Sequence, residues 1–500
     1  MQQLNSQVPT LRVHLERDDI VAIDKPYVLY WMTANRRTGW NYSLQRALDW
    51  CEELGKPLVV LEALRSNYRW ASDRFHAFVI QGMLDQSQRF DRPGVTYLPY
   101  IEPSPNAGAG LLKHLASDAA VVVSDDYPCF FLPGMIRAAR RQITVRFELV
   151  DSNGLLPLRA TDRVFTRAFD LRRFLQKNLP DHLTEAPQAD PLVKRKLPTA
   201  WPVSEEVKKG WPSANLEAFE NSFHSLAELP IDHSVSVVNG EPGGETAASR
   251  QLTTFILQRL ILYSEQRNQP EQQAASELSA YLHFGNLSVH EVLAAVVERE
   301  NWNPSKLSSS TSGARAGWWG MSETSESFLD QFVTWRELGF NMCFRRRDYD
   351  RYESLPAWAQ QTLDEHAKDR REQVYSLAEF DQASTHDNLW NAAQRQLVAE
   401  GRIHNYLRML WGKKILEWTS HPREALDVMI HLNNRYALDG RDPNSYSGIF
   451  WVLGRYDRAW GPERPIYGKI RYMSSDNTAR KVRVKDYIRR YAEQPPRLFD

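Results

Sequence analysis

Five short apolar runs alternate with segments of helical spacing between residues 28 and 151, and this alternation limits the fold more than any other feature. The runs lie at 28–32, 58–64, 94–100, 119–126 and 143–151. The helical segments lie at 41–54, 73–90 and 111–118. Strands that alternate with helices of this length form a parallel sheet with helices on both faces. The pattern predicts a doubly wound, Rossmann-like α/β domain. No GxGxxG sequence follows its first strand, so no motif names a ligand.

From residue 246 the apolar spacing becomes almost wholly helical. One helix face in 246–268 carries a set of apolar side chains, Leu252, Phe255, Ile256, Leu260 and Tyr263. Residues 152–245 hold many prolines and charges, which is typical of a long connection, and 305–320 is interpreted as a flexible inserted loop. A chain of 500 residues has room for two or three domains. We expect an α/β domain, a linker and an all-α domain, at 20–155, 156–245 and 246–495.

Composition excludes several classes of protein. The three cysteines, Cys51, Cys129 and Cys343, are far apart and odd in number, which argues against a disulfide framework or a zinc site and for a reducing compartment. The N-terminal residues show no signal-peptide pattern, and no apolar run is long enough for a transmembrane helix. We therefore expect a cytoplasmic protein without a metal.

Charge is informative only locally. The net charge is zero, but residues 441–500 carry 13 Lys and Arg against 7 Asp and Glu. This surplus suits a surface that binds phosphates, and it also suits a solvated tail.

Two motifs indicate binding. In 276–288 a serine-rich helix start precedes an apolar run; its hydroxyls and backbone N–H groups suit a cofactor pyrophosphate, or they simply cap the helix. In 332–341 Trp335 and Arg336 are adjacent, an aromatic for stacking beside a fork of donors, although a packed Trp and a surface ion pair give the same pattern.

The chain has sixteen tryptophans, and several gather between 390 and 451. Trp411 and Trp418 are seven residues apart and share a helix face, and Trp390 lies one helix earlier. Such a set is either core packing or a path for electrons. Arg408 lies one turn before Trp411 and needs a carboxylate, for which Asp439 and Asp442 are the candidates.

The chain resembles class II cyclobutane pyrimidine dimer photolyases of the photolyase/cryptochrome superfamily. The resemblance rests on six motifs in order, LSAYLHFGNLS (278–288), WRELGFN (335–341), HDNLWNAAQ (386–394), GRIHNYLRMLWGKKILEWTS (401–420), LNNRYALDGRDPNSYSG (432–448) and ERPIYGKIRYM (463–473). The N-terminal half matches more loosely, through VLYWM and DRVFTRAFDLRRF (162–174). The resemblance implies an N-terminal antenna domain, a helical FAD-binding domain and a monomer acting on double-stranded DNA that contains pyrimidine dimers. For the antenna domain the resemblance leaves three alternatives: a deazaflavin, a folate or an empty pocket.

The resemblance also assigns roles to residues. FAD would be held by Tyr263, Arg267, Ser276, Leu278, Ser279, Arg336, Arg408, Asp439 and Asp442. Flavin N5 would face Asn433. Photoreduction would run through Trp390, Trp411 and Trp418. The flipped dimer and its DNA would contact Trp335, Trp451, Arg441 and Arg455.

The implied reaction is light-driven repair, in which reduced FAD donates an electron to a flipped dimer and the cyclobutane ring splits. One residue departs from the family. Where the family has a glutamate against the dimer, this chain has Gln331, which can form hydrogen bonds but cannot transfer a carboxylic proton. This departure leaves three alternatives: repair is less efficient, Asp330 takes over the role, or the protein has shifted toward signalling.

Two other functions compete with repair. A cryptochrome-like blue-light photoreceptor would keep the flavin and the tryptophans without efficient repair, and Gln331 favours it, whereas the short C-terminus after ERPIYGKIRYM favours repair. A plain flavin oxidoreductase is disfavoured by the absence of a dinucleotide motif.

Overall fold

The computed structural model describes residues 4–193, 195–220 and 223–493. They form two compact units. The sheet unit comprises Met1–Arg163, Leu175–Ile256 and Glu277–Leu307. The helical unit comprises Val164–Phe174, Leu257–Ser276 and Ser308–Asp500. Both units are therefore assembled from separate stretches of chain, and the domain boundaries expected from the sequence stay a prediction.

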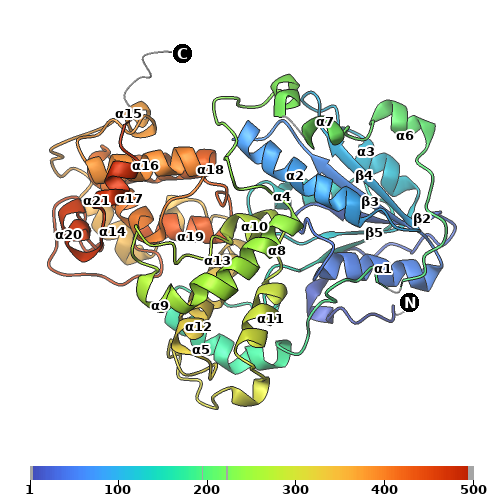
Figure 1. Ribbon diagram of the computed structural model, residues 1–500, viewed down its shortest axis with the longest axis horizontal. Coiled ribbons are helices and arrows are strands. Elements are labelled where there is room, and N and C mark those ends of the chain that lie inside the picture. The colour runs from blue at the N-terminus through green and yellow to red at the C-terminus, as the bar shows by residue number, and fades with distance from the viewer. Residues whose placement is uncertain (1–3, 194, 221–222, 494–500) are drawn as a thin grey trace. The chain divides into compact units, whose positions relative to one another are not determined.

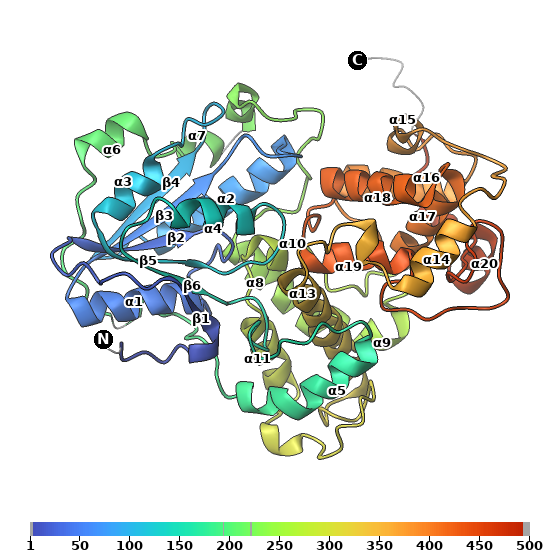
Figure 2. The same ribbon diagram turned by 180° about the vertical axis from the view of Figure 1, so that it is seen from behind.

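The sheet unit contains a six-stranded sheet in the order β1-β6-β5-β2-β3-β4, with all six strands labelled in Figure 2. Its strands are β1 (Val13–Arg17), β2 (Tyr27–Met32), β3 (Leu58–Leu64), β4 (Val95–Ile101), β5 (Ala119–Asp125) and β6 (Arg146–Val150). All neighbours are parallel except β1, which pairs antiparallel with β6. The predicted fold class, a doubly wound sheet followed by a helical region, is confirmed. Strand β1 was not predicted, because every residue of VHLER is only half-buried and the strand lacks an apolar run.

The strands of the sheet are buried on both faces. Side chains alternate along β2: Tyr27, Leu29 and Trp31 pack in one core, and Val28, Tyr30 and Met32 pack in the other. Helix α1 (Tyr42–Leu54) covers the second core, and α3 (Leu111–Ser117) and α4 (Leu132–Arg140) cover the first, as Figures 1 and 2 show from opposite sides. Helix α2 (Asp73–Arg89) follows β3. Burial on both faces explains why these strands are continuous apolar runs.

The strand order reverses at β2: β3 and β4 follow on one side of it, and β5 and β6 on the other. In α/β folds, ligands bind at such a switch point, here between β2 and β5. Here Asp125, at the end of β5, accepts hydrogen bonds from the backbone N–H groups of Thr33, Ala34 and Asn35 at 2.8–3.0 Å. The carboxylate of Asp125 thus fixes the loop that follows β2.

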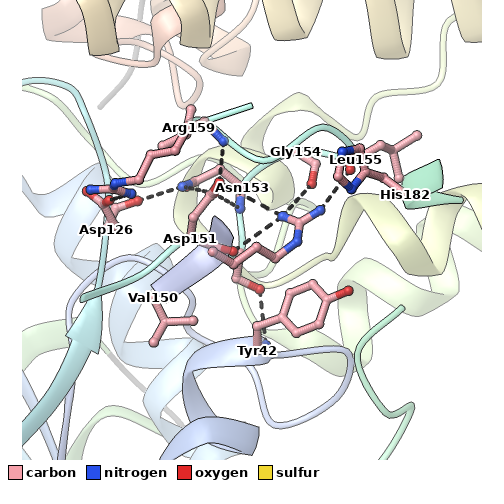
Figure 3. Close-up of polar contacts among 12 residues, drawn as sticks. Tyr42, Asp126, Val150, Asp151, Asn153, Gly154, Leu155, Arg159 and His182 are labelled. Carbon is pink, nitrogen blue, oxygen red and sulfur yellow. Dashed lines mark hydrogen bonds and ion pairs between the residues drawn. The ribbon is translucent and has the colours of Figure 1, made fainter. Parts of the chain in front are cut away.

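The segment after β6 is fastened by a buried polar network (Figure 3). Asn153 donates to the Asp126 carbonyl at 2.6 Å, and Arg159 pairs with the Asp126 carboxylate at 2.6 Å. The fully buried Arg12 donates to the carbonyls of Gly154 and Leu155. The network thus links the segment that follows β6 to Asp126, the first residue of the loop between β5 and α4.

The remaining helices of the sheet unit are short, α6 (Glu205–Gly210), α7 (Glu217–Glu220), α8 (Glu245–Thr254), α10 (Ser279–Phe284) and α11 (Val289–Arg299). Helix α5 (Ala168–Asn178) spans a boundary between the units. Those of the helical unit are α9 (Tyr263–Gln266), α12 (Glu323–Leu329), α13 (Arg336–Arg345), α14 (Ala357–Glu365), α15 (Leu377–Asp381), α16 (Asn388–Glu400), α17 (Asn405–Trp418), α18 (Pro422–Tyr436), α19 (Pro443–Val452), α20 (Ser475–Lys481) and α21 (Lys485–Arg490).

Two π-helical segments interrupt the α-helices, at Phe255–Arg259 and Asp330–Trp335. The first divides the long helix predicted over 246–268, although the predicted apolar face of that helix is buried throughout. π-Helical turns occur often at functional sites.

Residues 307–320 belong to no helix or strand, so the expected loop is present, and its flexibility stays a prediction. Trp318 and Trp319 are buried, and Glu326 accepts hydrogen bonds from the backbone N–H groups of Gly317 and Met321. The two buried indoles anchor the second half of this loop. Within the described ranges, no helix is long and apolar enough to cross a membrane, and no group of three metal-ligating side chains occurs.

Candidate functional site

Helices α16, α17, α18 and α19 form the core of the helical unit (Figure 1). Gly412 lets α17 approach its neighbours, because a Cβ atom there would lie 2.6 Å from Val452 on α19 and 3.0 Å from Met429 on α18. Gly339 does the same for α13, since its Cβ atom would lie 2.9 Å from the Pro443 carbonyl. The two glycines thus allow the helices that carry the candidate residues to pack closely.

The three tryptophans of the predicted electron path are in contact. The rings of Trp390 and Trp411 are parallel, with centroids 6.5 Å apart, and those of Trp390 and Trp418 are 5.9 Å apart at 70°. Trp390 is therefore the middle member. All three are buried, and the Trp390 indole N–H donates to the Trp411 carbonyl at 3.0 Å. The Trp411 indole donates to Gln394 at 2.9 Å, so each of these two polar ends is satisfied.

The predicted ion pair is present at one end of this group. Arg408 lies 3.3 Å from Asp439, and both side chains are 15% exposed. Among the described residues, the buried Nε of Arg408 has no hydrogen-bond acceptor. A charged group that is partly desolvated and incompletely paired is suited to a further polar or anionic ligand.

Asn433 and Asp442 lie on either side of the turn between α18 and α19. Asn433 is 2% exposed and its amide donates to Ser445 at 2.7 Å. Asp442 caps α19 by accepting from the Asn444 N–H at 2.8 Å. Both are therefore rigidly held, and their predicted contacts with a flavin stay predictions.

The π-helical segment Asp330–Trp335 carries Gln331 and Trp335, both half-buried. Asp330 is committed elsewhere: it pairs with Arg172 at 2.7 Å, and both side chains are buried. Because its carboxylate is already engaged by the Arg172 guanidinium, Asp330 is less available than Gln331 to a further partner. Gln331 therefore remains the candidate polar contact beside Trp335.

Trp451 carries two cations, which the sequence did not indicate. The Lys413 ammonium lies 5.3 Å from its ring centroid and the Arg471 guanidinium 5.2 Å. Lys413 is fully buried and donates to the Val452 carbonyl at 2.5 Å, and Arg471 pairs with Asp457 at 3.0 Å. Burial lowers the pKa of Lys413 to about 7, with Asp457 opposing the shift. Cations over an indole hold its ring in place.

Three predicted arginines are buried. Arg336 lies with its guanidinium 4.3 Å from the Phe340 ring centroid. Arg441 donates to the Asn434 carbonyl at 2.6 Å, and Arg455 donates to the Tyr349 carbonyl at 2.7 Å. The structure thus gives Arg441 and Arg455 packing roles, and their contact with DNA stays a prediction.

The residues predicted to hold the FAD phosphates fall in both units. Tyr263, Arg267 and Ser276 belong to the helical unit, whereas Leu278 and Ser279 belong to the sheet unit. Arg267 lies 5.5 Å from the ring centroid of the buried Tyr263.

Two further residues lie near these candidates in the sequence or in space. Leu278, at the start of α10, has no side-chain group that could cap the helix. His404, before α17, contacts the Arg267 backbone, and burial lowers its pKa to about 4. His404 lies within the motif at 401–420, but the sequence analysis assigned it no role because a lone histidine does not reveal its burial.

A separate aromatic cluster, Tyr68, Trp70, Phe130 and Phe131, lies in the sheet unit after the carboxyl ends of β3 and β5. Trp70 and Phe130 stack at 6.0 Å, and both have positive φ angles, 72° and 60°. Bulky residues rarely adopt this backbone conformation, and such strain often marks a binding site. Among the described residues, the buried indole N–H of Trp70 has no acceptor.

Comparison with known proteins identifies the family. The chain is 34% identical over 487 residues to the deoxyribodipyrimidine photo-lyase of Methanothermobacter thermautotrophicus, covering 96% of this chain and 98% of that protein. The chain belongs to the deoxyribodipyrimidine photo-lyase family. Photo-lyases of Potorous tridactylus and Arabidopsis thaliana are each 31% identical, over 92% of this chain and 80% and 88% of theirs. Family membership makes the chain an enzyme, a light-dependent lyase. No family model matches.

Solved structures of photolyases and cryptochromes share its fold. A class III photolyase of Agrobacterium tumefaciens superposes with a TM-score of 0.66 at 17% identity, over 93% of this chain and 86% of that one. A Synechocystis cryptochrome gives 0.62 at 15% identity, over 93% and 88%. At these identities the likeness concerns the fold alone.

Proposed function

We propose that this photo-lyase is a cytoplasmic, monomeric class II enzyme that repairs cyclobutane pyrimidine dimers in double-stranded DNA with reduced FAD. The observation that carries the proposal is the contact series Trp411–Trp390–Trp418 beside the Arg408–Asp439 pair, within a chain of this family. A bound, reduced flavin supplies the light-excited electron that splits the dimer. The residues of the chain bind the flavin and the dimer, orient them and shield them from water.

The residues present fit a flavin. Arg408 keeps a buried Nε without an acceptor in the described part of the chain, although it is already paired with Asp439. A cation that is only partly paired favours a ligand that carries negative charge. No carboxylic acid then has to donate a proton to that ligand. Tyr263, Arg267 and Ser276 of the helical unit would hold the phosphates and ribityl chain. Asn433 would face the flavin ring.

Trp335 and Trp451 would hold the flipped dimer. Both rings are only half-buried, unlike the three tryptophans of the path. Stacking on an aromatic ring contributes roughly 1–3 kcal/mol per base, and flipping a poorly stacked lesion costs a few kcal/mol, so two such rings can offset the flipping. Gln331 lies one turn before Trp335 and would donate hydrogen bonds to the dimer carbonyls.

The proposal also covers the antenna chromophore. A planar deazaflavin or folate would stack on the cluster of Tyr68, Trp70, Phe130 and Phe131, where the Trp70 N–H offers an unused donor. Reconstitution with each compound, followed by gel filtration, tests this: Trp70→Ala is expected to lose the retained chromophore, and retention equal to the wild type would contradict the placement.

Trp335 and Trp451 together are called the lesion clamp. The variants Trp335→Ala and Trp451→Ala test it. Each variant is expected to bind dimer-containing duplex about tenfold more weakly, as roughly 1–3 kcal/mol of stacking implies, with bound FAD and affinity for undamaged DNA unchanged. Trp319→Ala, a buried tryptophan outside the clamp, is the control. Unchanged dimer affinity in both clamp variants would refute the assignment.

A further inference from the structure

The electron path continues past Trp418 to a tyrosine–histidine pair. The ring of Tyr375 lies 5.6 Å from Trp418, and that of His386 lies 5.0 Å from Trp418. The Tyr375 hydroxyl lies 2.6 Å from His386 Nδ1. Tyr375 is half-buried and His386 is exposed, so the pair extends the buried series to solvent.

The Tyr375 hydroxyl can donate its proton to His386. The backbone N–H of His386 donates to the Tyr375 oxygen at 3.1 Å, and Nδ1 accepts the hydroxyl proton when the imidazole carries its own proton on Nε2. A neutral imidazole protonated at Nε2 presents Nδ1 as an acceptor. The Tyr375 backbone N–H also donates to the Trp418 carbonyl at 3.0 Å, which fixes the tyrosine against the tryptophan.

A positive charge on Trp418 would have a cation beside it. The Lys414 ammonium lies 5.2 Å from the Trp418 ring centroid and repels such a charge, although its pairing with Glu417 at 2.8 Å reduces the repulsion. A phenol can lose an electron without gaining charge only when its proton leaves with the electron. Trp418 therefore has a neighbour that can neutralise it, and that neighbour has a base.

We propose that Tyr375 is the terminal electron donor of the path and that His386 accepts its proton. The step rests on the proposed function, which supplies an oxidised Trp418 during photoreduction of the flavin. One electron passes from Tyr375 to the Trp418 radical cation, which becomes a neutral indole. The hydroxyl proton moves from Tyr375 to His386 Nδ1, which leaves a neutral tyrosyl radical and an imidazolium. Because the imidazolium is exposed, its proton escapes to water, and charge recombination slows.

The test is electron paramagnetic resonance of the flavin-loaded protein, frozen during illumination. Wild type is expected to show a tyrosyl radical. Tyr375→Phe is expected to show a tryptophanyl radical instead and a several-fold lower yield of reduced flavin. His386→Ala is expected to lose the tyrosyl signal and regain it with added imidazole. Transfer from Tyr375 is expected to slow in D2O. Tyr491→Phe is the control, because Tyr491 also has a base, Glu400 at 2.5 Å, but its ring contacts Tyr487.

A tryptophanyl radical in wild type, or a tyrosyl signal that survives Tyr375→Phe, would overturn the proposal. So would a His386→Ala variant whose tyrosyl yield equals that of the wild type. Repair by chemically reduced Tyr375→Phe is expected to equal that of the wild type, because the pair acts only in photoreduction. Failure of the wild type to bind flavin or to repair dimers would instead refute the proposed function, so the two failures are distinguishable.

Discussion

Replacing Lys413 with methionine is expected to stabilise the protein at neutral and acidic pH. Burial lowers the pKa of Lys413 from 10.5 to about 7, so the folded protein holds this proton less tightly than the unfolded chain. At about 1.4 kcal/mol per pKa unit, holding the proton below pH 7 costs about 5 kcal/mol. Lys413→Met removes that cost and loses the bond to Val452 and the cation over Trp451, roughly 2 kcal/mol together. A net gain of about 3 kcal/mol is expected.

The same shift fixes a pH dependence. Between pH 7 and 10.5 the unfolded chain binds more protons at this site, so the free energy of unfolding rises with pH there, by about 2 kcal/mol from pH 7 to 9. Below pH 7 both states are protonated and the contribution is flat. In Lys413→Met this rise is absent.

Urea unfolding at pH 6.5 and pH 9 measures both effects. Lys414→Met is the matched control, because the ammonium of Lys414, the next residue in the chain, lies 2.8 Å from Glu417 rather than over the Trp451 ring. A Lys413→Met variant less stable than the wild type at pH 6.5, together with a wild type whose stability does not rise toward pH 9, would refute the reasoning.

Three further perturbations test the site. Gln331→Glu is expected to raise the quantum yield of repair, measured by dimer loss per absorbed photon, and an unchanged yield would show that the missing acid does not limit repair. Trp411→Phe is expected to slow photoreduction of oxidised flavin, followed by absorbance, without abolishing repair by chemically reduced enzyme; normal photoreduction would remove Trp411 from the path. Arg172→Met leaves Asp330 buried and unpaired and is expected to cost about 3–5 kcal/mol of unfolding free energy, most of which Asp330→Asn in the same chain restores; no restoration would mean that the pair is not the cause.

The sequence predicts much of the fold because its signals are local. Strands β2 to β6 are apolar runs that begin and end close to the expected residues. A strand that is buried on both faces is apolar at nearly every position, so it can be recognised from its local sequence alone. Strand β1 escaped because an edge strand of five half-buried residues leaves no apolar run. The π-helical turn at Asp330–Trp335 escaped because a single extra residue in a helical turn does not change composition.

The candidate site was predictable where spacing along one helix decides. Trp411 and Trp418 share a face of α17, and the expected carboxylate for Arg408 proved to be Asp439. The cations over Trp451 were not predictable, since Arg471 reaches the ring from a distant segment and Lys413 looks like a solvated lysine in sequence. Contacts between segments far apart in the chain depend on packing that no single helix encodes.

Blue-light illumination of a duplex containing one cyclobutane pyrimidine dimer, with the flavin-reduced protein, tests the central claim most directly. Restored monomers are measured by chromatography against a dark control and a flavin-oxidised control. Monomers are expected to return only in the illuminated, reduced sample. Flavin photoreduction that proceeds normally while the dimer stays intact would contradict repair and favour the photoreceptor.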